Sequence, residues 1–262
     1  MKKNIVFIPN IGVGNNRNKP YHFSIKSWKK WAEQFKDIEV IEWTEPILDT
    51  KDFHIIYQRE WVFDILDHNG IEYDQILVVD ADTIVHPDCP NFFKETNHEY
   101  AGIIENADYE WVTRSINGWG HYLLPNHVKP KVWEYVNTGF IIINSKHKDF
   151  FNKVKNYYHS NINHINDIKS NALYQNFKLT SIGQTIVNYF LIEDNVKKTL
   201  LPECYNLTNL HMKNLLHVPG RSWWPDELIF LEAGWVYHFN GIPAGPRNQY
   251  YWMERTYNEL YG

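Results

Sequence analysis

The chain has 262 residues, 44% of them hydrophobic, with two cysteines and a formal net charge of −5. This length can bury one substantial core, so we expect a single domain over residues 1–262, and two cysteines set no disulfide framework, which fits a reducing, cytoplasmic location. The acidic balance disfavours nucleic acid as the main partner, and no run approaches the ~18 consecutive apolar residues of a membrane-spanning helix.

The chain begins with a pattern typical of a parallel α/β sheet. The apolar run 5–8 is too short for a signal peptide and predicts a first strand, which ends at Pro9 and Asn10. The glycines that follow do not have the Gly-x-Gly-x-x-Gly spacing, which excludes a dinucleotide site. A helix over 23–35 and an alternating strand over 38–43 complete the strand–helix–strand unit.

The next helix and strand lead to two acids. We expect a helix over 57–67, which carries Arg59 and ends at an Asn-Gly pair. The run Ile-Leu-Val-Val at 76–79 predicts a fully buried strand, and Asp80 and Asp82 follow it. Because buried unpaired acids are costly, these two should lie where the strand leaves the sheet, at the edge where ligands bind in α/β folds.

The spacing of the two acids indicates a metal site. Alternating residues of an extended segment share a face, so Asp80 and Asp82 can point at one object. Two hard oxygen ligands suit Mg²⁺ or Mn²⁺, and such ions commonly hold a substrate diphosphate. The alternative is an Asx-type turn that caps the backbone after the strand.

The middle of the chain contains a second polar stretch at a strand. After a short helical piece at 91–94 and a strand over 100–105, residues 106–131 show little periodicity and predict a long functional loop. A strand follows over 136–144. Its Gly139 would let backbone approach a sugar, and the Asn137 amide could bind sugar hydroxyls; a β-bulge is the alternative.

The remaining elements alternate again. We expect a helix over 146–158, a polar connection to residue 171, a helix over 182–190, a strand that ends near His238, and a final helix over 248–260. The aromatic content of 16% is mostly core packing, although some rings could stack on sugars.

Short motifs along the chain together resemble one enzyme family. They are Val-Asp-Ala-Asp-Thr at 79–83, Asn-Thr-Gly at 137–139, Gln-x-x-x-Asn at 184–188, Leu-Pro-x-x-Tyr-Asn-Leu at 201–207 and His-x-x-Gly at 238–241. In this order they resemble the GT-A-fold glycosyltransferases, and most closely the retaining glycogenin-like family, glycosyltransferase family eight. The resemblance implies an α/β, Rossmann-like GT-A fold with a mixed, mostly parallel sheet flanked by helices.

The resemblance also implies a function. It implies a metal-dependent glycosyltransferase that moves a sugar from a nucleotide-diphosphate sugar to an acceptor. The favoured donor is a UDP-sugar, and the implied reaction retains the anomeric configuration. The implied metal is Mn²⁺, with Mg²⁺ as the alternative, because imidazole suits manganese better. The implied ligands are Asp80, Asp82 and His238.

Individual site residues follow from the same family motifs. The resemblance implies donor binding by Pro9, Asn10, Arg59, Asp80, Ala81, Asp82, Asn137, Gly139, Gln184 and Gly241, and catalysis by Asp108 and Gln184. We add Arg247 to both groups, since the family's diphosphate-binding lysine is missing from this chain. Glu105 and Glu110 compete with Asp108 for the acid near the donor sugar, and any of the three could act as the general base of an inverting enzyme.

Two positions depart from the family pattern. Gly183 stands where the family has an aspartate that contacts the donor sugar. The family's diphosphate-binding lysine is missing after Gly241, and we expect Arg247 to supply the positive charge from a longer loop.

Several alternatives remain open from the sequence. The same acids could bind a nucleoside triphosphate in a nucleotidyltransferase, or the chain could be a catalytically inactive protein that binds sugar nucleotides. The acceptor could be a glycan, a protein, a lipid-linked saccharide or a modified nucleobase. The sequence indicates no oligomeric state.

Overall fold

The computed structural model describes residues 2–12, 14, 16–51, 53–106, 108–171, 181–216 and 228–262. Its main sheet has the strand order β2-β1-β3-β6-β5-β7. The strands are β1 Lys3–Pro9, β2 Ile38–Trp43, β3 Tyr73–Val79, β5 Tyr100–Ile104, β6 Val136–Asn144 and β7 Lys198–Leu200. Strand β6 runs antiparallel to both of its neighbours, and the other pairs are parallel. The predicted mixed, mostly parallel α/β sheet is therefore confirmed.

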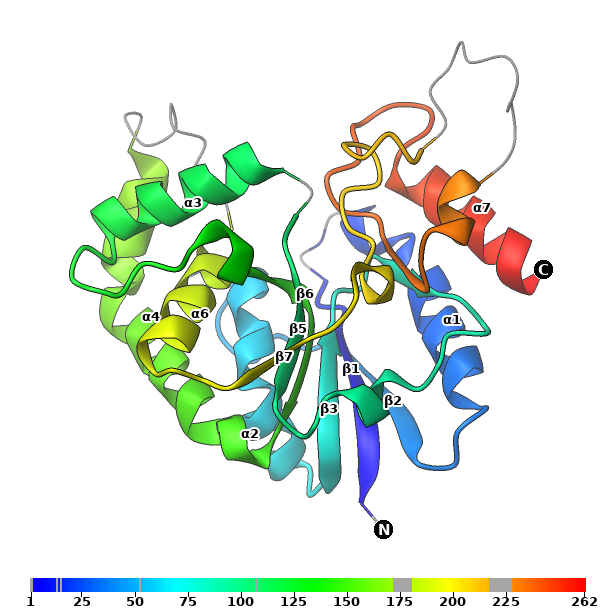
Figure 1. Cartoon of the computed structure of the whole chain (residues 1–262), viewed down its shortest axis with the longest axis horizontal. Helices are drawn as coiled ribbons and strands as arrows, with labels where there is room; N and C mark the ends of the chain where they lie inside the picture. The colour runs from blue at the N-terminus through cyan, green and yellow to red at the C-terminus, as the bar shows by residue number, and fades with distance from the viewer. Residues whose placement is uncertain are drawn as a thin grey trace.

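Helices cover both faces of this sheet (Figure 1). They are α1 Tyr21–Ala32, α2 Val62–His68, α3 Tyr109–Tyr122, α4 Lys148–Ser170, α6 Ile182–Glu193 and α7 Gln249–Tyr261. In the view of Figure 1, α2, α3, α4 and α6 lie on the left of the sheet and α1 and α7 on the right. On β3, Ile76 and Val78 belong to one core, and Leu77 and Val79 to the other. Burial on both faces explains why this strand is an unbroken apolar run.

A second, two-stranded sheet lies just beyond the end of β3. It pairs β4 Thr83–Val85 with β8 Val236–His238 in antiparallel fashion, and Thr83 lies opposite His238. Helix α1 holds this segment in place, because Trp28 Nε1 donates to Thr83 Oγ1 (3.0 Å), which in turn donates to the carbonyl of Asp80 (2.9 Å). The buried Trp28 of α1 thus helps to fix the backbone that carries the acid pair.

The expected loop over 106–131 is wrong, because α3 occupies Tyr109–Tyr122. Val112, Ile116 and Trp119 are buried at helical spacing and form its inner face. Two glycines obscure this pattern in the sequence. Gly120 serves packing, since a Cβ there would lie 2.1 Å from Tyr189 Oη of α6.

Other boundaries also differ from expectation. Helix α4 continues to Ser170 where a polar connection was expected, because Ile165 and Ile168 extend its buried stripe beneath an Asn-rich exposed face. The helix expected over 57–67 is a 3-10 helix, Ile55–Trp61, followed by α2. No helix in the described ranges is long and apolar enough to cross a membrane.

Candidate metal and nucleotide site

Backbone pairing brings the two acids beside two distant segments. Asp80 follows β3 directly, and its N–H donates to the carbonyl of Gly139 on β6 (2.9 Å). The carbonyl of Asp82 accepts from the N–H of Phe239, the residue after β8 (2.8 Å). Strands β6 and β8 therefore deliver Gly139 and His238 to the acids, although they are far apart in the sequence.

Three ligand atoms converge at this point. His238 Nε2 lies 3.1 Å from Asp82 Oδ1 and 3.7 Å from Asp80 Oδ2. The other carboxylate oxygens are engaged, since Asp80 Oδ1 accepts from Arg59 Nη1 (2.7 Å) and Asp82 Oδ2 accepts from Gln249 Nε2 (2.9 Å). Each acid is thus held in place through one carboxylate oxygen and directs the other toward His238. The three candidate ligand atoms lie within 4.8 Å of one another.

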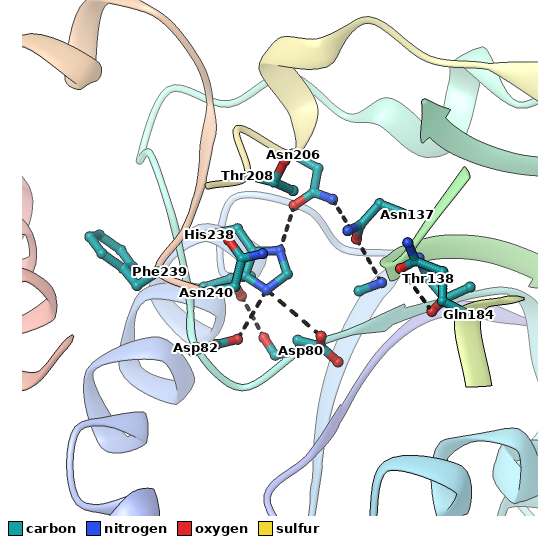
Figure 2. Close-up of polar contacts among 12 residues, drawn as sticks. Asp80, Asp82, Asn137, Thr138, Gln184, Asn206, Thr208, His238, Phe239 and Asn240 are labelled. Atoms are coloured by element: carbon teal, nitrogen blue, oxygen red, sulfur yellow. Dashed lines mark hydrogen bonds and ion pairs between the residues drawn. The ribbon is translucent and has the colours of Figure 1, made fainter. Parts of the chain in front are cut away.

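A chain of amides fixes the tautomer of His238 (Figure 2). The N–H of Gly139 can only donate, so the atom of Asn137 that it contacts at 2.8 Å is the carbonyl oxygen. This oxygen also accepts from Asn206 Nδ2 (3.1 Å), which leaves Asn206 Oδ1 to accept from His238 Nδ1 (3.1 Å). With its proton on Nδ1, His238 directs the Nε2 lone pair toward the two carboxylates, as a metal ligand requires.

The charges of these side chains agree with this geometry. Burial lowers the pKa of His238, but Asp82 and Asp80 outweigh burial and raise it overall. Burial raises the pKa of Asp82, but His238 and Arg17 lower it overall. The raised pKa favours a proton on Nε2, and a divalent cation would take the same position between the two carboxylates.

The residues present fit such a cation. A Cβ on Gly139 would lie 2.6 Å from His238 Cε1 and 2.7 Å from Asp80 Oδ2, so only glycine leaves room for both ligands. One imidazole and two carboxylates match Mn²⁺, and their oxygen atoms match Mg²⁺. The metal would leave further coordination positions for substrate oxygens.

The three ligands lie on a cavity of about 550 Å³. This volume is within the usual range for small-molecule sites. It brings together eleven of the residues singled out from the sequence: Pro9, Arg59, Asp80, Ala81, Asp82, Glu105, Asp108, Asn137, Gln184, His238 and Gly241.

Four other candidates do not line the cavity in the described structure. Asn10 donates to Glu42 and accepts from Asn18, a residue that does line the cavity. Gly139 lies between the metal ligands, as described above. Glu110 is exposed and paired with Arg114, and Arg247 is exposed, with its guanidinium carbon 5.9 Å from the ring centroid of Tyr251.

Gln184 has a defined orientation in this cavity. Its Oε1 accepts from the N–H of Thr138 (3.0 Å), which identifies the other polar atom of the side-chain amide as the donor Nε2. The side chain is buried, and Nε2 has no hydrogen-bond partner among the described residues. Since buried donors are normally satisfied, the lack of a described partner for Nε2 sets Gln184 apart from its neighbours in the cavity wall.

Gly183 has a packing explanation. Its carbonyl accepts from the hydroxyl of Tyr158 (3.3 Å), and a Cβ there would lie 3.4 Å from that hydroxyl and 3.6 Å from the Tyr57 ring. Aromatic side chains therefore occupy the surroundings into which a longer side chain at 183 would extend.

Some site residues escaped the sequence analysis. Arg17, Tyr21, Trp111 and Gln249 line the cavity, and none of them belongs to a motif. Asn206 lies within the Leu-Pro-x-x-Tyr-Asn-Leu motif, but the sequence alone indicates no role for it. Its contact with His238 depends on how β8 lies beside residues 205–207, which spacing does not show.

Comparison with known proteins identifies the fold. No family model matches the chain, and no curated protein matches it. Solved structures with a similar fold include a glycosyltransferase involved in glycosylation of the major capsid of PBCV-1, with 11% identity, coverage of 96% of this chain and 98% of that chain, and a TM-score of 0.54. Galactosyltransferase LgtC, in complex with donor and acceptor sugar analogues, has 15% identity, coverage of 98% and 94%, and a TM-score of 0.51. At this identity the likeness shows the fold, and the predicted GT-A fold is confirmed.

Proposed function

We propose that this protein is a metal-dependent glycosyltransferase that takes its sugar from a nucleoside-diphosphate sugar, with UDP as the nucleotide. The main support is the convergence of Asp80, Asp82 and His238 on one cavity of a chain that has the fold of solved glycosyltransferases. The family resemblance favours retention, and the acceptor class stays open.

The chain's own residues have separable tasks in this reaction. Asp80, Asp82 and His238 would hold Mn²⁺ or Mg²⁺, and the bound cation would neutralise charge that develops on the leaving diphosphate. Arg59 and Gln249 orient the two acids through the oxygens that face away from His238. Gln184 Nε2 would bind an oxygen atom of the transferred sugar.

Glu105 and Asp108 also lie at the cavity, but different numbers of protein groups hold their carboxylates. Glu105 is buried in the cavity wall and accepts from Asn137, Thr208 (3.4 Å) and Asn209 (3.3 Å). Asp108 lies at the start of α3 and lines the same cavity. We propose Asp108 for contact with the donor sugar, because fewer protein groups hold its carboxylate.

The experiment is a thermal-shift and calorimetry screen of UDP, GDP, ADP and their sugar conjugates, with and without MnCl₂. Binding to the native state raises the melting temperature, and we expect UDP to do so only with the metal. Asp82→Asn should abolish this effect. Asp88→Asn is the matched control, since that carboxylate is exposed on the same segment.

Product analysis separates the remaining alternatives. A glycosyltransferase hydrolyses or transfers its sugar and releases the nucleoside diphosphate. A nucleotidyltransferase would release pyrophosphate from a nucleoside triphosphate. Metal-dependent binding without either reaction, across a panel of acceptors, would indicate an inactive binding protein and contradict the proposal.

A further inference from the structure

The cavity has more acids than cations. Its described lining contains the carboxylates of Asp80, Asp82, Glu105 and Asp108, and only two guanidinium groups, Arg17 and Arg59. A divalent cation would bring these formal charges into balance, but a nucleoside diphosphate adds further negative charge. Binding therefore needs a positive group that is not already used to hold the metal site.

Arg59 does not meet this need. It is buried, its Nη1 donates to Asp80 Oδ1 (2.7 Å) and to the carbonyl of Thr138 (2.9 Å), and its Nε donates to the carbonyl of Ile56 (3.3 Å). These contacts commit Arg59 to the orientation of Asp80.

Arg17 is placed differently. It lies in a 3-10 turn, Asn16–Asn18, between β1 and α1, and its side chain is exposed to solvent at the cavity. Its Nε donates to the hydroxyl of Tyr21 (3.1 Å), a buried residue of α1 that also lines the cavity. A rigid helix thus holds the guanidinium where solvent and substrate can reach it.

Arg17 is also close enough to the metal ligands to feel their charge. Burial lowers the pKa of Arg17, but Tyr21, Asp82 and Asp80 outweigh burial and raise it. When a divalent cation neutralises the two aspartates, this attraction weakens, and a phosphate beside the metal would offer the guanidinium a new negative charge.

His54, which precedes two residues of the cavity wall, lies near two cations. Burial lowers the pKa of His54, and the nearby cations Lys169 and Arg17 lower it further. Ile55 and Ile56, the next residues, line the cavity. An anion bound beside Ile55 and Ile56 would lie near these two cations.

We propose that Arg17 binds the diphosphate of the sugar donor, together with the metal, and does so in place of Arg247. The planar guanidinium can give two parallel hydrogen bonds to phosphate oxygens. This inference rests on the proposed function, and it adds a phosphate-binding residue that no family motif contains.

The test is calorimetry with UDP, UMP and uridine in MnCl₂, on the parent protein and the variants Arg17→Gln, Arg17→Lys and Arg247→Gln. For Arg17→Gln we expect UDP affinity to fall roughly 10–100-fold, the scale of a charged hydrogen bond, with uridine affinity unchanged. Arg17→Lys should recover part of the loss, and the salt dependence of UDP binding should become weaker in Arg17→Gln. Arg247→Gln should bind UDP as the parent does.

Melting temperatures of all variants keep folding separate from binding. The inference is overturned if Arg17→Gln is folded and binds UDP with parental affinity, or if the loss appears in Arg247→Gln instead. In either case the proposed function stands, because the parent still binds UDP with the metal. If the parent binds no nucleoside diphosphate with Mn²⁺, the proposed function and this inference fall together.

Discussion

At the scale of single residues, the three candidate metal-binding residues could be found from sequence, whereas two of the groups that orient them could not. Asp80, Asp82 and His238 belong to recognisable short motifs. The groups that orient them, Gln249 and Asn206, act through contacts between distant segments. Such contacts depend on the path of the chain in space, so spacing alone cannot reveal them.

Gly139 gives the sharpest prediction at this scale. Gly139→Ala should weaken Mn²⁺ binding ~10-fold or more, because its Cβ would meet both His238 and Asp80, and displaced ligand supports typically cost that much. The measurement is Mn²⁺ calorimetry, corrected for the folded fraction. Gly102→Ala on β5 is the control, since its Cβ would make an ordinary 3.5 Å contact with Val136 Cβ. Equal metal affinity in the two variants would contradict the ligand assignment.

Gln184 should discriminate between UDP and a UDP-sugar. Gln184→Glu keeps the oxygen that accepts from Thr138 and replaces the buried donor Nε2 with an acceptor. We expect UDP affinity to stay as in the parent and UDP-sugar affinity to fall about tenfold, as for a lost hydrogen bond with repulsion added. Titration of both ligands on both proteins measures this difference. Parallel losses for UDP and UDP-sugar would mean that Gln184 only supports the cavity wall.

At the scale of elements, prediction succeeded where burial left a simple pattern. The strands over 38–43 and 136–144 have the expected bounds, because their apolar runs or alternation end at clear polar residues. Helix α3 was missed because Gly118 and Gly120 interrupt its pattern, and the second of them is required by contact with α6. The three-residue strands β4 and β7 are too short to give a period of their own.

Helix α3 also allows a test of Asp108. Its Oδ1 accepts from the N–H of Trp111 (3.0 Å), so this acid is the N-cap of α3 as well as a cavity residue. Asp108→Ala should cost about 1 kcal/mol of stability through the lost cap, whereas Asp108→Ser keeps a capping oxygen and the parent's stability. If Asp108 binds the donor sugar, both variants should lose turnover on an identified donor and acceptor. Parental turnover in Asp108→Ser would show that the acid serves only as a cap.

At the scale of the whole molecule, one sheet separates two apolar cores, and the site lies where its strands end. Alternation along β1 and β3 sends neighbouring side chains to opposite cores, so the sheet is buried on both faces. The fold class could be predicted because the central strands β1, β3 and β6 follow this rule. The antiparallel placement of β6 could not, since an apolar run carries no information on strand direction.

The free energy of unfolding of the whole molecule should depend on pH through one buried acid, Glu60. Burial raises the pKa of Glu60 to about 7, although Arg59 lowers it and Asp80 raises it further, and its Oε2 has no partner among the described residues. Between the ordinary pKa of 4.5 and about 7, the folded protein binds more protons than the unfolded chain, so the free energy of unfolding falls as pH rises through this interval. The difference between the two values corresponds to at most roughly 3 kcal/mol.

Glu60→Gln removes this charge while it keeps the volume of the side chain. We therefore expect the variant to be more stable than the parent at pH 8, and its melting temperature to change less between pH 5 and pH 8. Denaturant unfolding at both pH values measures the free energies directly. Glu33→Gln, at an exposed position after α1, is the control and should follow the parent's pH profile. A parental profile for Glu60→Gln would show that the carboxylate stays ionised in the folded protein, with its charge balanced by Arg59.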